Sequence, residues 1–225
     1  MDIPTFEVYE TMTALNFLFE PDRVCIVMDT LMVRPDTRRP LLYTSKIFTL
    51  PHLGGVMCGT GVMQLVIDWF VCIQTAVIVR DIPHLDQYAP NQLRAIAGKY
   101  DLNSKLTSTI YHFGYSEIDQ RYRGFAYRSE KNFISEELEY GFGIKPPVEF
   151  EPIQSLPKGF VEMMEQQRIE DRKKPTEDQV GIGGDIHLFV MTPEQMVLTR
   201  CHRFEDYESC YSKMLENLRT EKGWT

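Results

Sequence analysis

A threonine and an aspartate near the start of this sequence are the first pair of residues that could take part in chemistry. The runs at 13–19 and 24–32 are rich in aromatic and β-branched residues, as strands are, and the EPDR segment at 20–23 is typical of a turn. Folding about that turn brings Thr13 opposite Asp29 at the open end of a hairpin. A hydroxyl becomes an effective nucleophile only with a base beside it, and no histidine adjoins either residue in the sequence.

A lysine opens the next expected strand. Lys46 precedes IFTL, and the chain returns beside that strand before a glycine-marked turn at 58–61 that leads into a long apolar helix at 61–79. These residues also have ordinary structural interpretations. Thr13 suits the start of a strand because it is β-branched, and Asp29 suits a carboxylate that caps the turn at Thr30 or pairs with Lys46.

The rest of the chain alternates between groups of strands and groups of helices. The pattern predicts an amphipathic helix at 84–101 with a bend or fresh start at Pro90, strands within 106–116, 122–129 and 132–143, a helix at 158–174, a hairpin turning at 193–195 and a helix at 204–222. Strands in two groups separated by helices favour an α+β fold in which two sheets pack face to face with helices outside.

The order of these residues and elements resembles that of proteasome β-type subunits and their bacterial relatives, the N-terminal-nucleophile (Ntn) hydrolases. There a threonine begins the first strand, an aspartate ends the second, a lysine starts the third and a glycine-containing segment precedes the first long helix. The matching positions are Thr13, Asp29, Lys46 and Gly59. The resemblance implies a four-layer αββα sandwich, with two antiparallel sheets flanked by helices, formed by a single domain over 13–225 that follows an N-terminal extension at 1–12.

The resemblance also implies a site. In that family the threonine hydroxyl attacks an amide carbonyl, the threonine's own α-amine acts as the base, and the lysine and aspartate tune the site. The corresponding catalytic residues are Thr13, Asp29 and Lys46, with a substrate cleft at Gly59 and Thr60. The chemistry requires the threonine to be the first residue of the mature chain.

The residues before Thr13 depart from that pattern. Twelve residues precede it, and Met12 stands where the family's processing glycine is expected. We therefore favour a non-processed, non-catalytic subunit that serves assembly or binding, as the family's α-type subunits do. The alternatives are a threonine peptidase or amidohydrolase activated by removal of residues 1–12, with Thr13 as the nucleophile, and a peptide or small-molecule binding module that uses the same cleft without chemistry.

The composition limits which classes of partner and which cellular compartment we expect. The chain has 225 residues and a net charge of −8, which argues against a broad nucleic-acid-binding surface. Its five cysteines contain no CxxC pair, and an odd number of thiols in mostly apolar runs suits the reducing cytoplasm. The apolar run at 61–79 is interrupted by Asp68, which is costly in a bilayer, so no membrane span is expected.

No cofactor or metal is expected either. His187 and Cys201 fall roughly opposite each other in the last hairpin, but two ligands do not make a structural zinc site. The RGFAY run at 123–127 matches only half of an RNA-binding strand motif, and the GIGG run at 181–184 precedes a strand rather than a helix, so it fails as a dinucleotide-binding loop.

Self-association is expected from the apolar helix. The segment 61–79 is apolar around most of its circumference, more than one packing face requires. In the resembled family, helices at this place face neighbouring subunits, so we expect a homo-oligomer, either a ring or a dimer. A peptide or protein is a separate expected ligand. The candidates for the uncovered stripe of this helix are Met63, Trp69, Ile73 and Val77.

Overall fold

The computed structural model describes residues 10–11, 13–34, 37–100, 102, 106–150 and 155–222. Within these residues the chain forms two compact units. The first contains Phe48–Glu139 together with the strand β1 (Glu10–Thr11), and the second contains 13–47 and 140–222. Most of the predicted extension at 1–12 lies outside the described residues, and the assignment of 13–225 to one domain stays a prediction.

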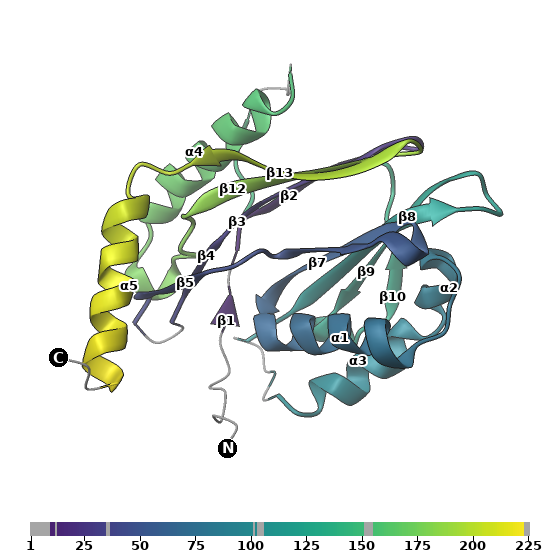
Figure 1. Cartoon of the computed structure of the whole chain (residues 1–225), viewed down its shortest axis with the longest axis horizontal. Helices are drawn as coiled ribbons and strands as arrows, with labels where there is room; N and C mark the ends of the chain where they lie inside the picture. Colours follow the sequence, from purple (N-terminus) through teal and green to yellow (C-terminus); the bar gives the residue numbers. More distant parts are fainter. Residues whose placement is uncertain are drawn as a thin grey trace. The chain divides into compact units, whose positions relative to one another are not determined.

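The first unit is a six-stranded sheet with three helices packed against it (Figure 1). Its strand order is β1-β7-β8-β9-β10, antiparallel along this path, and β6 also pairs with β7. The strands are β6 (Ile47–Leu50), β7 (Gly55–Val62), β8 (Thr109–Ser116), β9 (Arg121–Arg128) and β10 (Ser135–Glu137). The helices are α1 (Met63–Ala76), α2 (Ile82–Asp86) and α3 (Ala89–Ala97), which begins with Pro90 in its first turn.

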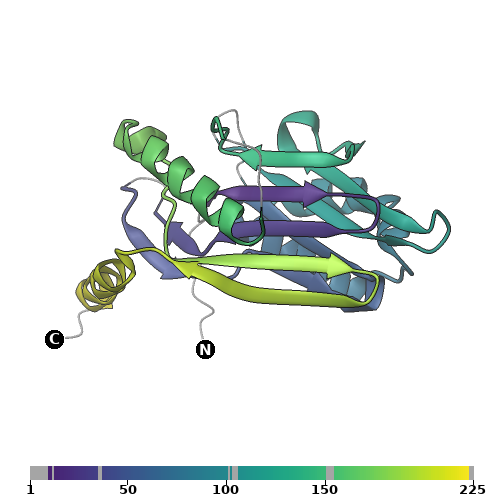
Figure 2. The same cartoon turned by 90° about the horizontal axis from the view of Figure 1, so that it is seen from above.

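The second unit is built on a five-stranded antiparallel sheet with the order β11-β2-β3-β12-β13. The strands are β2 (Leu15–Phe19), β3 (Val24–Asp29), β11 (Gly141–Lys145), β12 (Asp185–Thr192) and β13 (Gln195–Arg203). Figure 2 shows α4 (Lys158–Arg172) crossing this sheet, where Phe160 and Met164 of the helix share a core with Cys25 and Val27 of β3.

The predicted first hairpin is confirmed. Leu15 pairs with Met28 and Phe19 pairs with Val24, and every residue of β3 is buried, as its run of apolar residues requires. The predicted helix at 158–174, the last hairpin and the C-terminal helix are confirmed as α4, as β12 with β13, and as α5 (Tyr207–Lys222).

A small two-stranded sheet was not expected from the sequence. It consists of β4 (Leu31–Val33) and β5 (Pro40–Tyr43), and α5 packs against it (Figure 1). Met214 of α5 contacts the core formed by Leu31 and Val33, and the Tyr43 ring stacks on that of Tyr207 at 4.4 Å between centroids.

Two predicted boundaries are wrong. Residues 58–61 continue β7 rather than forming a turn, and α1 starts only at Met63, because these residues pair with β8 through register pairs such as Gly59 with Ile110. The run at 132–143 is divided between β10 and β11, which belong to different sheets. Its two halves are separated by the boundary between the two units.

The predicted uncovered stripe of α1 is also wrong. Met63, Trp69 and Ile73 are buried, because their spacing marks the face that packs onto the sheet, and Val77 lies just beyond the helix end. The large hydrophobic residue that α1 exposes is Val71. Among the described helices, none combines the length and apolar character needed to cross a bilayer.

Among the glycines of β7, Gly61 has the least room for a side chain. Its φ is +99°, and a Cβ there would lie 2.1 Å from the carbonyl oxygen of Thr107. We expect Gly61→Ala to lower the free energy of unfolding by roughly 2–4 kcal/mol, because it adds both backbone strain and a clash. Denaturant titration would measure this loss.

Gly98 provides the matched control. Its φ is −59°, and a Cβ there would approach no closer than 3.5 Å to its nearest neighbours. Gly98→Ala should therefore be neutral or stabilise by about 0.4–1 kcal/mol, since alanine restricts the unfolded chain. Equal effects of the two substitutions would contradict the structure around Gly61.

Candidate functional site

Three polar side chains converge inside the second unit. The Thr13 hydroxyl donates to Asp29 Oδ1 at 2.7 Å, and Lys46 Nζ donates to both the Thr13 hydroxyl oxygen and Asp29 Oδ1, the latter at 3.1 Å. All three side chains are buried. The predicted convergence of these residues, with Lys46 paired to Asp29, is therefore confirmed as geometry, while their role remains to be proposed.

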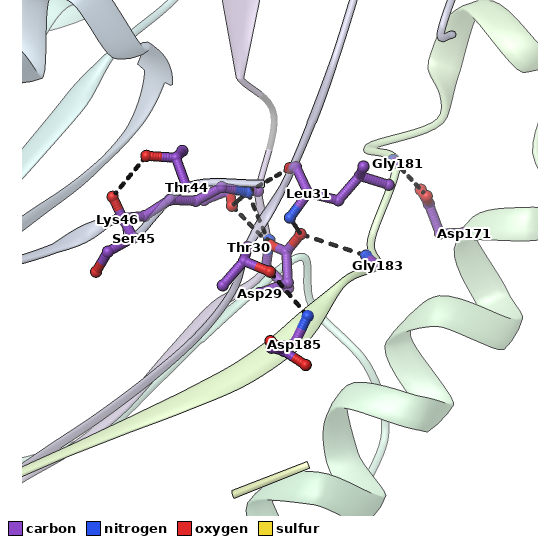
Figure 3. Close-up of polar contacts among 12 residues, drawn as sticks. Asp29, Thr30, Leu31, Thr44, Ser45, Lys46, Asp171, Gly181, Gly183 and Asp185 are labelled. Atoms are coloured by element: carbon purple, nitrogen blue, oxygen red, sulfur yellow. Dashed lines mark hydrogen bonds and ion pairs between the residues drawn. The ribbon is translucent and has the colours of Figure 1, made fainter. Parts of the chain in front are cut away.

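Local structure explains how the three residues meet. Thr13 lies two residues before the start of β2 and Asp29 ends β3, so the hairpin register brings them together at its open end. The chain then leaves through β4 and returns through β5, and the Thr44 amide donates to the Thr30 carbonyl at 2.9 Å. This return delivers Lys46, two residues later, to the hairpin's open end (Figure 3).

The Asp29 carboxylate is fully used as an acceptor. Besides Thr13 and Lys46, Oδ1 accepts from the Ala14 amide at 3.1 Å. Its other oxygen, Oδ2, accepts from the amides of Leu31 at 3.2 Å and Gly183 at 3.3 Å. These donors hold the buried carboxylate in one orientation. If the carboxylate turned, some of its charge would lose its hydrogen-bond donors in a place that water does not reach.

The Lys46 ammonium is equally well satisfied. Its third hydrogen bond goes to the Leu31 carbonyl at 2.7 Å, so each of its three N–H groups has an acceptor. Burial lowers the pKa of Lys46 below its ordinary value, and the nearby Asp29 carboxylate acts in the opposite direction. Chemically, the arrangement places a cationic donor directly on the Thr13 hydroxyl oxygen, where it would stabilise negative charge.

A glycine-containing loop supports Asp29 from the other side. Gly183 donates to Asp29 and its carbonyl accepts from the Leu31 amide at 3.1 Å, while the Asp171 carboxylate of α4 accepts from the Gly181 amide at 2.9 Å (Figure 3). The loop thus connects α4 to the site. Sequence reasoning noted these glycines and missed this role, for which the only signal was their clustering before a strand.

The predicted cleft residues lie in the first unit. Gly59 and Thr60 are buried in β7, and a Cβ at Gly59 would lie 2.7 Å from a side-chain methyl of Val66 in α1. Close helix packing therefore explains why this position is glycine. Their assignment to a substrate cleft stays a prediction.

The described residues contain no cluster of histidine, cysteine and acidic side chains arranged to hold a metal. His187 pairs with Arg200 across the last hairpin, while the Cys201 thiol lies 3.4 Å from the Ile186 carbonyl. His202 contacts Glu165 at 3.1 Å. These three residues thus have separate surroundings.

Comparison with known proteins identifies the class of fold as the proteasome-like Ntn hydrolase fold, as predicted. Two solved structures are similar over nearly the whole chain. One is the Anbu (Gly-1) mutant from Hyphomicrobium sp. strain MC1, with a TM-score of 0.58 and 14% identity, covering 94% of this chain and 97% of that one. The other is Anbu (ancestral beta-subunit) from Yersinia bercovieri, with a TM-score of 0.57 and 10% identity, covering 95% of this chain and 97% of that one.

No protein-family model and no curated protein matches the sequence. At 14% and 10% identity, the structural similarity establishes the fold and not the activity.

The buried ion pair yields a stability prediction. Asp29→Asn leaves the Lys46 ammonium without a counter-charge and should lower the free energy of unfolding by about 3–5 kcal/mol. Adding Lys46→Met to the same chain removes the stranded charge and should recover part of that loss. Denaturant unfolding of the wild type, both single variants and the double variant measures the coupling. Strictly additive losses would contradict the ion pair.

Proposed function

We propose that this chain is a non-processed, non-catalytic proteasome-like subunit that assembles with copies of itself, as a ring or a dimer, and presents a peptide- or protein-binding surface. The observation that supports this proposal is Met12, which stands directly before Thr13 where the family's processing glycine is expected. As long as residues 1–12 stay attached, the Thr13 nitrogen belongs to a peptide bond with Met12 and cannot accept a proton at neutral pH. The Thr13 hydroxyl therefore lacks the base that an N-terminal nucleophile uses.

The segment just before Thr13 supports the same proposal. Glu10 and Thr11 form β1 and pair antiparallel with Val62 and Gly61 of β7. This pairing lies immediately beside Gly59 and Thr60, the predicted cleft residues in the same strand. An extended peptide that sought the same edge of β7 would have to displace β1.

A second candidate is a threonine peptidase or amidohydrolase that becomes active when residues 1–12 are removed. It is favoured by the contact of Lys46 Nζ and Asp29 Oδ1 with the Thr13 hydroxyl. Removal of the extension would give Thr13 a free amine, and Lys46 would stabilise the developing alkoxide.

Covalent labelling distinguishes the two candidates. An electrophile that bridges a terminal threonine's hydroxyl and amine should leave the full chain unmodified, because Thr13 has no free amine. A chain prepared to begin at Thr13 provides the comparison, with Thr13→Ala as its negative control and Thr44→Ala as a matched threonine control near the site. Mass spectrometry would report the adduct.

Labelling of the full chain at Thr13, together with peptidase activity, would overturn the non-catalytic proposal. Labelling of only the shortened chain, lost in Thr13→Ala and kept in Thr44→Ala, would show that the site is latent. If neither form is labelled, the hydrolase candidate is excluded.

A further inference from the structure

The C-terminal helix α5 carries an apolar stripe exposed on its own subunit. Tyr211, Leu215 and Leu218 are 46%, 39% and 42% exposed. Their spacing of four and three residues places them along one face of the helix. Met214, on the neighbouring face, is buried against β4, so the stripe continues the face that anchors the helix.

Two charges of opposite sign border this stripe on the same side. Glu208 and Arg219 are about three helical turns apart, which puts them on one flank of the helix, next to Leu215. Glu208 lies in the first turn and its side chain is 80% exposed, with Arg203 as a distant partner at 3.9 Å. Arg219 is exposed near the other end of α5.

We propose that this stripe binds α5 of a second copy of the chain in antiparallel orientation. A two-fold axis running across the two helices reverses their direction and keeps each flank on the same side. Glu208 of one copy then faces Arg219 of the partner subunit. By symmetry, Arg219 of the first copy faces Glu208 of the partner subunit. A parallel arrangement would bring opposite flanks together and lose both ion pairs.

The apolar contacts fit the same register. With the axis between Met214 and Leu215, Tyr211 lies level with Leu218 of the partner subunit, and the Leu215 side chains of the two copies meet close to the centre. Aromatic and leucine side chains in this arrangement form the buried centre of the contact, while the charge pairs lie at its rim and specify its orientation. This interface deepens the proposed oligomeric role and rests on it.

The test is the mass of the full chain by light scattering coupled to size-exclusion chromatography at tens of micromolar. The wild type should form dimers or larger assemblies built from them. Leu215→Asp buries a charge in the contact and should weaken self-association at least tenfold. Thr220→Asp adds the same charge to the opposite face of α5 and should leave the assembly unchanged. Thermal unfolding at low concentration checks that both variants fold.

Charge exchange tests the antiparallel orientation. Glu208→Arg alone places like charges together at both rims, as does Arg219→Glu alone, so each should weaken association. The double variant restores opposite charges and should recover wild-type assembly. Rescue of this kind is specific for two copies of α5, because binding to a different protein would not be repaired by the exchange.

Three results would overturn the inference. A monomeric wild type would contradict both this interface and the proposed oligomeric role. An assembly unaffected by Leu215→Asp would contradict the interface alone and leave the proposed role standing. Loss of assembly in both single charge variants without recovery in the double variant would exclude the antiparallel arrangement.

Discussion

The buried ion pair between Asp29 and Lys46 is the interaction on which the second unit depends. Removing two charges from water is costly, and it is tolerated only when all of their hydrogen-bonding capacity is used. Here Asp29 receives donors from three separate segments besides Lys46, at Thr13–Ala14, Leu31 and Gly183. Each of these segments must therefore be in place before the pair is stable, which couples the hairpin, β4 and the glycine loop.

The need to satisfy this buried ion pair explains two features of the second unit, the small sheet of β4 and β5 and the glycine loop before β12. The chain takes a detour through β4 and β5 between Asp29 and Lys46, and α5 holds this small sheet through Met214. The loop at Gly181–Gly184 is fastened to α4 by Asp171 and reaches Asp29 through the Gly183 amide. Gly184 has a φ of +82°, and a Cβ there would lie 2.4 Å from the Thr30 hydroxyl, so the loop needs glycine to come this close.

The sequence was most predictive where local chemistry decides the structure. The turn at 20–23 sets the register that brings Thr13 to Asp29, and the order of elements indicated the fold. Prediction from the sequence failed where contacts between distant parts of the chain determine the structure. Gly183 reaches Asp29 from more than 150 residues away, and no local pattern shows this. The core-facing residues of α1 were assigned to an exposed stripe because an apolar helix does not show which side meets its sheet.

The proposed function depends on whether the bond between Met12 and Thr13 stays intact, more than on the geometry of the site. Lys46 and Asp29 both contact the Thr13 hydroxyl, but the Thr13 nitrogen is a free amine only if residues 1–12 are removed. The most direct measurement is the N-terminal peptide of the protein isolated from its own cells, determined by mass spectrometry. Our account predicts that peptides spanning the Met12–Thr13 bond are recovered from the mature protein. A mature chain that begins at Thr13 would contradict it.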